Sequence, residues 1–464
     1  MPHKSHQAFR RIFRPLAAGL LSIGLLSTPC LAVPGDCPDT SPHLAGRRDV
    51  TVSRPNGSTF TCTLHYPATS DGVNAPFDPS GGPYPIVSFG HGFLSPVTLY
   101  QSTLAALARH GYFVIASQSQ GGLFPNHSAF ALDLRYSVDW LVAQNGKSGQ
   151  YPGKVAVGSI AFSGHSMGGG AAMLAAKDDP RERLLITLAA ANTNPSSNAA
   201  MTSITTPTVL VVGSVDTIVP PNGSATVQYA NAAGPRQIRS IVGGSHCGFI
   251  DSPIVACDDA AIPEAEQRAI TVAILKRSLD QAFEPDGCAW ESVWGPEANA
   301  MAGVDETVDP RMTVTAGSPL VEGPAGGTAT VTVSVTNGMG VARSFEWRGN
   351  DVSFSPATVG PVAAGATATS TATISIPAGA TADYSLILSA RSVEDGSTRG
   401  WTALTVRPVA GGVFGDLNGD GVVNGSDLTI LLSTWGLCPG CPADLDGNGE
   451  VDAGDLASLL AAWQ

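Results

Sequence analysis

Residues 160–176 read IAFSGHSMGGGAAMLAA. Apolar residues that suit a strand are followed by GHSMG at 164–168, and an alanine-rich run that suits a helix comes next. A Gly-x-Ser-x-Gly turn between a strand and a helix is typical of a nucleophile elbow, which holds its serine in a strained backbone conformation. Glycines fit this turn because bulkier neighbours would clash. The stretch predicts that Ser166 is a nucleophile, and a tight turn without chemistry is the alternative.

Strand-like and helix-like segments alternate on both sides of the elbow, from about residue 36 to 300. Alternation at this spacing predicts a doubly wound, mostly parallel α/β sheet that is covered by helices on both faces. The predicted strands are 85–89, 112–117, 156–162, 185–190, 208–212 and 237–242, and the predicted helices are 99–109, 131–144, 168–176 and 263–282.

A serine hydroxyl needs a base to activate it and a carboxylate to orient that base. On this kind of fold the three follow the chain order serine, acid, histidine. His246, in the glycine-rich segment VGGSHCGF, is the only histidine after Ser166. Asp216 follows an apolar strand, which places it at the carboxyl edge of the sheet where catalytic groups gather. The sequence therefore predicts a triad of Ser166, Asp216 and His246.

The negative charge that develops during ester cleavage needs two backbone donors. One candidate is the N–H of Met167, the residue after the nucleophile. The other is the N–H of Phe93, which ends the segment GHGF at residues 90–93. His91 in that segment is predicted to pack the loop, and a role as a second base is the alternative.

These segments together resemble a known family. With GHGF at 90–93, GHSMGGG at 164–170, VDTI at 215–218 and GSH at 244–246, the chain resembles α/β-hydrolases of the bacterial cutinase and poly(ethylene terephthalate) hydrolase type. It is also similar to their chlorophyllase and dienelactone-hydrolase relatives. The resemblance covers roughly residues 80–280. It implies an esterase that uses the triad and the oxyanion donors named above.

The substrate is less determined than the reaction. The resemblance favours polyester or cutin-like esters, although residues 188–195, LAAANTNP, lack the tryptophan that polyester hydrolases usually carry there. Esters of short-to-medium acyl chains, acyl groups on plant polysaccharide and lipids are the alternatives. From another class of function, the chain could be a non-catalytic binding component of an extracellular assembly.

The composition changes from about residue 308 to 407. Segments such as TATVTVSVTNG alternate residue by residue and end at turn residues, which predicts an immunoglobulin-like β-sandwich. The predicted organisation is a signal peptide at 1–32, an α/β-hydrolase domain at 33–305, this β-sandwich at 308–407 and a small helical domain at 413–464.

The last segment contains two similar copies, DLNGDGVVNGSDLTILLSTWG and DLDGNGEVDAGDLASLLAAWQ. They resemble the repeats of type I dockerin, which implies structural Ca²⁺ and a possible cohesin-type partner. Ca²⁺ takes six to eight oxygen ligands, and the spacing in each copy supplies them. The predicted helices are 428–435 and 456–463. The expected ligands are Asp416, Asn418, Asp420, the carbonyl of Val422, Asn424 and Asp427 in the first copy, and Asp444, Asp446, Asn448, the carbonyl of Glu450, Asp452 and Asp455 in the second.

The N-terminus and the charge bear on where the protein works. A basic start, a short apolar core at 16–26 and small residues up to Ala32 predict an export signal and a secreted protein that does not span a membrane. A formal charge of -13 argues against nucleic acid as a partner. An oxidising compartment favours disulfides, and the predicted pairs are Cys37–Cys62, Cys247–Cys257 and Cys438–Cys441.

Overall fold

The computed structural model describes residues 42–284, 287, 289–409, 414–418 and 421–464. The predicted signal peptide at 1–32 lies outside these residues. Among the described helices, none has an apolar stretch long enough to cross a bilayer.

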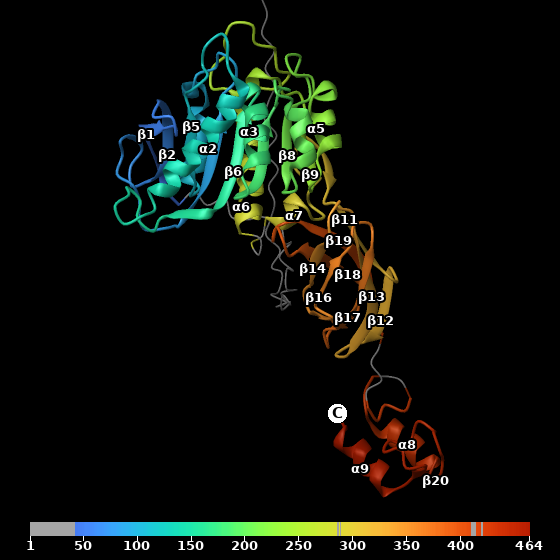
Figure 1. Cartoon of the computed structure of the whole chain (residues 1–464). Helices are drawn as coiled ribbons and strands as arrows, with labels where there is room; N and C mark the ends of the chain where they lie inside the picture. Colours follow the sequence, from blue (N-terminus) through green and yellow to red (C-terminus); the bar gives the residue numbers. More distant parts are fainter. Residues whose placement is uncertain (1–41, 285–286, 288, 410–413, 419–420) are drawn as a thin grey trace, which may run out of the picture. The chain divides into compact units, whose positions relative to one another are not determined.

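The first part of the chain forms a large mixed sheet with the strand order β10-β9-β8-β7-β6-β4-β5-β2-β1-β3 (Figure 1). The neighbours from β9 through β5 pair in parallel, as the alternating pattern predicts. The strands are β1 Leu44–Ser53, β2 Thr59–Ala68, β3 Gly72–Val73, β4 Tyr84–Gly90, β5 Phe113–Ser117, β6 Val155–His165, β7 Glu182–Leu188, β8 Thr208–Gly213, β9 Arg236–Ile241 and β10 Val304–Asp309.

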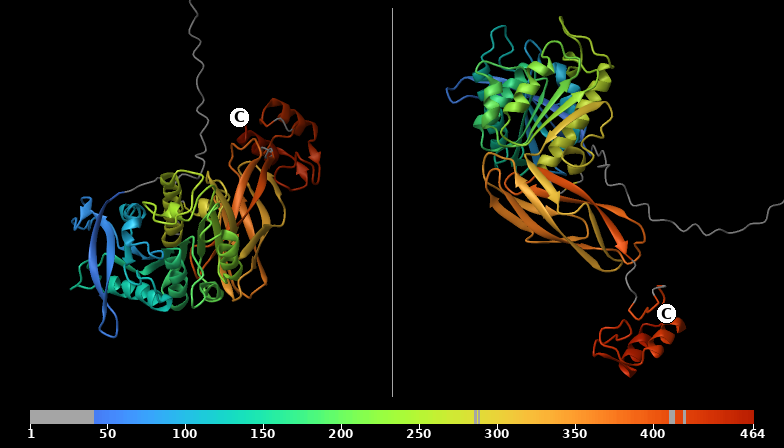
Figure 2. Two further views of the ribbon diagram at one scale, coloured as in Figure 1. Left: turned by 90° about the horizontal axis from the view of Figure 1, so that it is seen from above. Right: turned by 90° about the vertical axis from the view of Figure 1, so that its right-hand side faces the viewer.

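Helices cover both faces of this sheet (Figure 2). Successive residues of a strand point to opposite faces, so Ile86 joins one apolar cluster and Val87 the other. The helices are α1 Gln101–Arg109, α2 His127–Ala143, α3 Met167–Asp178, α4 Ser197–Ala200, α5 Ala225–Asn231, α6 Glu264–Phe283 and α7 Trp290–Val293, with short 3-10 turns at Val97–Tyr100, Met201–Ser203, Pro221–Gly223 and Cys247–Phe249.

Strands β1 and β2 are not among the predicted strands. They form an antiparallel hairpin that joins the sheet through β5. Cys62 lies on β2 as a buried free thiol, so its predicted disulfide with Cys37, which lies outside the described residues, is wrong. The physical reason is that Cys62 faces the apolar cluster beneath the sheet, where burial raises the pKa of the thiol.

The next part of the chain contains a four-stranded and a five-stranded sheet, in the orders β11-β13-β17-β15 and β12-β19-β18-β14-β16. Alternate residues of the strands are buried, and both sheets contribute to one apolar cluster that includes Val333, Phe345 and Val406. The strands are β11 Met312–Ala316, β12 Leu320–Pro324, β13 Thr328–Asn337, β14 Arg343–Arg348, β15 Val352–Ser355, β16 Thr358–Val362, β17 Thr367–Ser375, β18 Tyr384–Ser392 and β19 Arg399–Val409.

The C-terminal repeats each carry one helix, α8 Gly425–Ser433 and α9 Ala453–Ala461, and the strands β20 Gly436–Leu437 and β21 Glu450–Val451 pair between them. Both helices begin three residues before their predicted starts. Asn424 and Asp452 cap them in capping boxes, which satisfy backbone N–H groups and fix where each helix begins. Disulfides join Cys438 to Cys441 here and Cys247 to Cys257 in the first part of the chain, as predicted.

Candidate active site

The turn at Ser166 has the strained geometry that the sequence predicts. β6 ends at His165, α3 begins at Met167, and Ser166 between them has φ 54° and ψ -119°. A non-glycine residue at positive φ costs about 1–3 kcal/mol, so surrounding contacts must hold it. The N–H of Ser166 donates to the carbonyl of Leu188 at 2.9 Å, and its own carbonyl accepts from the N–H of Ala191 at 3.0 Å.

The glycines around Ser166 allow backbone segments to meet. A Cβ on Gly168 would lie 2.1 Å from the carbonyl oxygen of Gly90 at the end of β4. A Cβ on Gly164 would lie 2.5 Å from the carbonyl of Gly168. Only glycine lets the start of α3 pack directly on the ends of β4 and β6.

Asp216 and His246 meet at the carboxyl edge of the sheet. Their loops follow the adjacent strands β8 and β9, and Nδ1 of His246 lies 2.7 Å from Oδ2 of Asp216, with both side chains buried. The other oxygen, Oδ1, accepts the N–H groups of Ile218 at 2.9 Å and Val219 at 2.7 Å. Because the ionised carboxylate only accepts hydrogen bonds, Nδ1 of His246 carries the proton, and Nε2 of the neutral ring is left as an acceptor.

The elbow approaches the histidine loop through the residue before the serine. The ring centroids of His165 and His246 lie 4.5 Å apart. The hydroxyl of Ser166 has no hydrogen-bond partner among the described residues. In free enzymes the hydrogen bond between a catalytic serine and its histidine is often long, and it shortens when substrate binds.

The two N–H groups that are predicted to form the oxyanion hole are free to donate hydrogen bonds to a ligand. Within the described part of the chain, the N–H groups of Phe93 and Met167 have no acceptor. Phe93 is 43% exposed, so it is available to contact a ligand. His91 next to it is buried, and its two ring nitrogens lie 2.7 and 2.8 Å from the carbonyls of Gly92 and Ser119. These contacts agree with a packing role for His91.

A buried chain of hydrogen bonds connects the Phe93 loop to the elbow, and sequence reasoning missed it. The N–H of Gly92 donates to the hydroxyl of Tyr100 at 3.0 Å, and that hydroxyl lies 2.9 Å from Nδ1 of His165. Burial and the neighbouring His246 lower the pKa of His165 well below its ordinary value. A neutral His165 accepts the hydrogen bond of the Tyr100 hydroxyl at Nδ1 and adds no positive charge beside His246.

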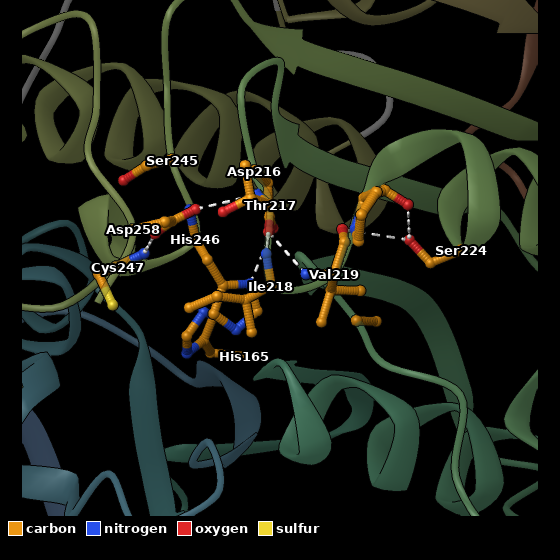
Figure 3. A network of polar contacts seen from close by, with 12 residues as sticks. His165, Asp216, Thr217, Ile218, Val219, Ser224, Ser245, His246, Cys247 and Asp258 are labelled. Carbon is orange, nitrogen blue, oxygen red and sulfur yellow. Dashed lines mark hydrogen bonds and ion pairs between the residues drawn. The ribbon is translucent and has the colours of Figure 1, made fainter. Parts of the chain in front are cut away.

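Two further residues hold the histidine loop and were also missed. Gln267 of α6 accepts the N–H of Ser245 at 2.9 Å and donates to its carbonyl at 2.7 Å. Asp258 accepts the N–H groups of His246 and Cys247 from one side and of Thr217 from the other (Figure 3). No motif marks either residue, because both act on backbone groups that only the fold brings near.

A cavity of about 700 Å³ adjoins the loop that carries Phe93. Its lining combines charged, polar and apolar side chains. The lining residues include Arg47, Asp49, Thr63, His91, Leu94, Ser95, Gln101 and Gln118.

The comparison with known proteins agrees with this geometry. The family model described as PET hydrolase-like matches residues 43–281, which is more than half of the chain. The chain belongs to the PET hydrolase-like family. This membership supports an α/β-hydrolase that cleaves esters. No curated protein matches the chain.

The C-terminal repeats place acidic side chains in two equivalent loops. In the second loop, oxygens of Asp444, Asp446 and Asp455 lie within 4.8 Å of one another. Oδ1 of Asp444 is buried without a hydrogen-bond partner among the described residues, as a metal ligand would be. Asp452 is not part of this group, and its side chain caps α9 by accepting the N–H of Gly454.

The first loop repeats the same contacts. Its first carboxylate, Asp416, accepts the N–H of Gly421 at 2.7 Å, as Asp444 accepts that of Gly449 at 2.9 Å. Its last carboxylate, Asp427, accepts three backbone N–H groups from equivalent positions to those that Asp455 accepts. Asn424 caps α8, and Asp420 lies outside the described residues. The carbonyls of Val422 and Glu450 and the side chains of Asn418 and Asn448 stay predicted ligands.

Proposed function

We propose that this chain is a secreted serine carboxylic-ester hydrolase with Ser166 as nucleophile, His246 as base and Asp216 as orienting acid. The contact between Nδ1 of His246 and Oδ2 of Asp216 at 2.7 Å is the observation that carries the proposal, because it leaves Nε2 of His246 ready to accept a proton. The strained backbone of Ser166 supports it further, since such strain is typical of a nucleophile elbow.

In the proposed first half-reaction, Oγ of Ser166 attacks the ester carbonyl and its proton passes to Nε2 of His246. The buried carboxylate of Asp216 stabilises the imidazolium that forms. The N–H groups of Phe93 and Met167 stabilise the oxyanion, and the start of α3 adds the positive end of a helix dipole. His246 then gives the proton to the leaving alcohol, and an acyl-enzyme remains on Ser166.

In the second half-reaction, a water molecule attacks the acyl-enzyme. His246 takes a proton from that water, and the same two N–H groups hold the second oxyanion. Collapse of the intermediate releases the carboxylic acid and returns the proton to Ser166. In this proposed cycle, every proton transfer and every charge is handled by the residues named above, without a metal ion or cofactor.

For the substrate, we favour polyester or cutin-like esters and esters of short-to-medium acyl chains. Membership of the PET hydrolase-like family supports this class. Acyl esters on plant polysaccharide are the second candidate, which the dockerin-like repeats favour. A non-catalytic binding component is the alternative from another class, and the pairing of Asp216 with His246 weighs against it.

The remaining parts are proposed to serve attachment. Residues 308–407 fit an immunoglobulin-like β-sandwich that acts as a spacer, because two sheets share one apolar cluster. Residues 413–464 fit a dockerin-like module in which Ca²⁺ stabilises the two loops. Gly421 and Gly449 have φ values of 87° and 94°, which suits the sharp turn at the sixth position of a calcium loop. A cohesin-type protein is the proposed partner.

The experiment compares the full chain with Ser166→Ala on p-nitrophenyl esters from acetate to palmitate, then on poly(ethylene terephthalate) film and acetylated xylan. We expect activity on short and medium chains that is lost in Ser166→Ala, and release of soluble acids from the film. Activity that survives the substitution would contradict the proposed nucleophile. A folded wild-type protein without activity on any of these esters would favour the binding component.

A further inference from the structure

We infer that Asp258 is a second functional carboxylate, a positioning residue that holds the loops of Asp216 and His246 in register and favours protonation of His246 during the reaction. This inference rests on the proposed function and deepens it. Asp258 lies in none of the sequence motifs that predict the active site.

Asp258 connects the two loops through backbone groups. Its Oδ2 accepts the N–H of Thr217, directly after Asp216, at 3.1 Å, and the N–H of His246 itself at 2.9 Å. Its Oδ1 accepts the N–H of Cys247 at 3.0 Å. Figure 3 shows Asp258 between these two loops. One side chain therefore fixes the backbone on both sides of the contact between acid and base.

All three contacts need an acceptor, which is why the residue must be an ionised carboxylate. Burial opposes ionisation of Asp258, but the N–H groups of His246, Cys247 and Thr217 outweigh it and hold its pKa below the ordinary value. An asparagine would keep one acceptor oxygen and turn its amide nitrogen, a donor, toward at least one of these N–H groups.

The chain covalently anchors Asp258 at this place. Cys257, its neighbour, forms the disulfide with Cys247, the neighbour of His246. The disulfide and the hydrogen bond from Cys247 to Asp258 thus join the same two segments. This arrangement restricts how far His246 can move from Asp216.

The charge of Asp258 also acts on the histidine. Asp216 contacts the His246 ring, the neutral ring of His165 packs beside it, and Asp258 contacts the backbone N–H of His246. When His246 takes the proton of Ser166, the carboxylates of Asp216 and Asp258 both stabilise the positive charge of the imidazolium. Loss of Asp258 therefore weakens proton uptake in addition to loosening the loops.

The test uses the full chain and a matched neighbour. Asp259 adjoins Asp258, is exposed and has no hydrogen-bond partner among the described residues. Asp258→Asn and Asp259→Asn therefore remove the same charge one residue apart. We expect kcat to fall about 10-fold in Asp258→Asn and about 100-fold in Asp258→Ala, with KM little changed, because small misplacements of catalytic groups cost that much. Asp259→Asn keeps the wild-type kcat.

The pH profile separates this role from a merely structural one. We expect the acid limb of kcat/KM to move to lower pH in Asp258→Asn and to stay in place in Asp259→Asn. A thermal melt reports whether each variant folds. If the Asp258→Asn and Asp258→Ala proteins do not fold, Asp258→Glu keeps the charge but displaces the oxygens, so kcat falls while the acid limb stays.

Three outcomes overturn the inference: equal kcat in Asp258→Asn and Asp259→Asn, an acid limb that does not move in a slowed Asp258→Asn, or full activity in Asp258→Glu. Ser166→Ala distinguishes these from failure of the proposed function. Activity that is lost in Ser166→Ala but equal in the two Asn variants rejects only the role of Asp258, whereas activity that survives Ser166→Ala rejects the proposed function.

Discussion

Nδ1 of His246 and Oδ2 of Asp216 lie 2.7 Å apart although thirty residues separate them in the chain. They meet because β8 and β9 are parallel neighbours whose carboxyl ends lie at the same edge of the sheet. Oδ1 of Asp216 is held by two backbone N–H groups, so the carboxylate can present only Oδ2 to the histidine.

This geometry predicts the effect of Asp216→Asn. The amide oxygen would take the two N–H groups, which turns the amide nitrogen toward Nδ1 of His246. The ring would then carry its proton on Nε2 and could not accept one from Ser166. We expect kcat to fall about 10³- to 10⁴-fold with the fold intact, measured on p-nitrophenyl butyrate. A fall of less than about 10-fold would contradict this role of the carboxylate.

The glycine contacts at the elbow predict that Gly168→Ala is severe. Its new methyl group would lie 2.1 Å from the carbonyl oxygen of Gly90, so the start of α3 must shift. We expect a loss of stability of about 1–3 kcal/mol or more and a strong loss of activity, measured by thermal unfolding and ester hydrolysis. Gly158→Ala on β6 is the control, because its methyl group meets nothing within 4 Å. Equal behaviour of the two variants would reject the close approach.

Because the hydroxyl of Tyr100 makes two buried hydrogen bonds, we expect Tyr100→Phe to lower stability and activity more than the same substitution at another buried tyrosine. Tyr100→Phe leaves the N–H of Gly92 and Nδ1 of His165 buried without partners, which costs about 1–3 kcal/mol each. We also expect a lower kcat, because the Phe93 loop loses its connection to the elbow. The hydroxyl of Tyr151 is buried without a partner among the described residues, so Tyr151→Phe should be neutral or stabilising. Similar melting temperatures and rates for both variants would contradict the prediction.

His65 is buried, so we expect the hydrolase domain to lose stability in acid. Burial and the nearby Arg47 lower the pKa of His65 to about 4. Between about pH 6.5 and about pH 4, this histidine binds a proton in the unfolded chain but not in the folded chain. The free energy of unfolding therefore decreases as the pH is lowered through this window, by up to about 1.4 kcal/mol per pH unit. His65→Phe removes this contribution. We expect the stability difference between variant and wild type to grow in favour of the variant from about pH 7 to about pH 5, and a constant difference would refute the claim.

The repeat loops predict two Ca²⁺ sites. Asp444→Asn removes a charge beside Asp446 and Asp455, so calorimetric titration of the full chain should show about two ions for the wild type and about one for the variant. Asp259→Asn should bind as the wild type does. Absence of any Ca²⁺-dependent heat, or equal binding by Asp444→Asn, would contradict the calcium assignment.

How much the sequence predicts depends on whether a residue acts through a local pattern. The parallel strands β4, β5 and β8 contain continuous apolar runs, and the elbow motif with a single downstream histidine suffices to predict Ser166 and His246. β1 carries Arg47, Arg48 and Asp49 in its middle, and this interruption hides its alternation. The structure pairs it with β2 in an antiparallel hairpin, and the turn at residues 54–58 contains an Asn-Gly pair that is typical of hairpins.

The supporting residues of the site were not predictable for a related reason. Asp258 and Gln267 bind backbone groups of other segments, and Tyr100 joins the backbone of Gly92 to the side chain of His165. Such contacts leave no recognisable spacing in the sequence. Cys62 shows the same limit, since nearness in sequence suggested a disulfide while the side chain points into an apolar cluster.

Ser166 is proposed to be the nucleophile of an ester hydrolase, and a covalent label on its side chain tests this role. The most direct measurement treats the full chain with p-nitrophenyl diethyl phosphate and locates the label by peptide mass spectrometry. We predict one equivalent of nitrophenol, a diethylphosphoryl group on Ser166 and parallel loss of esterase activity, with no label on this peptide in Ser166→Ala. Inactivation with the label on another residue, or full inactivation without a label on Ser166, would show that Ser166 is not the nucleophile.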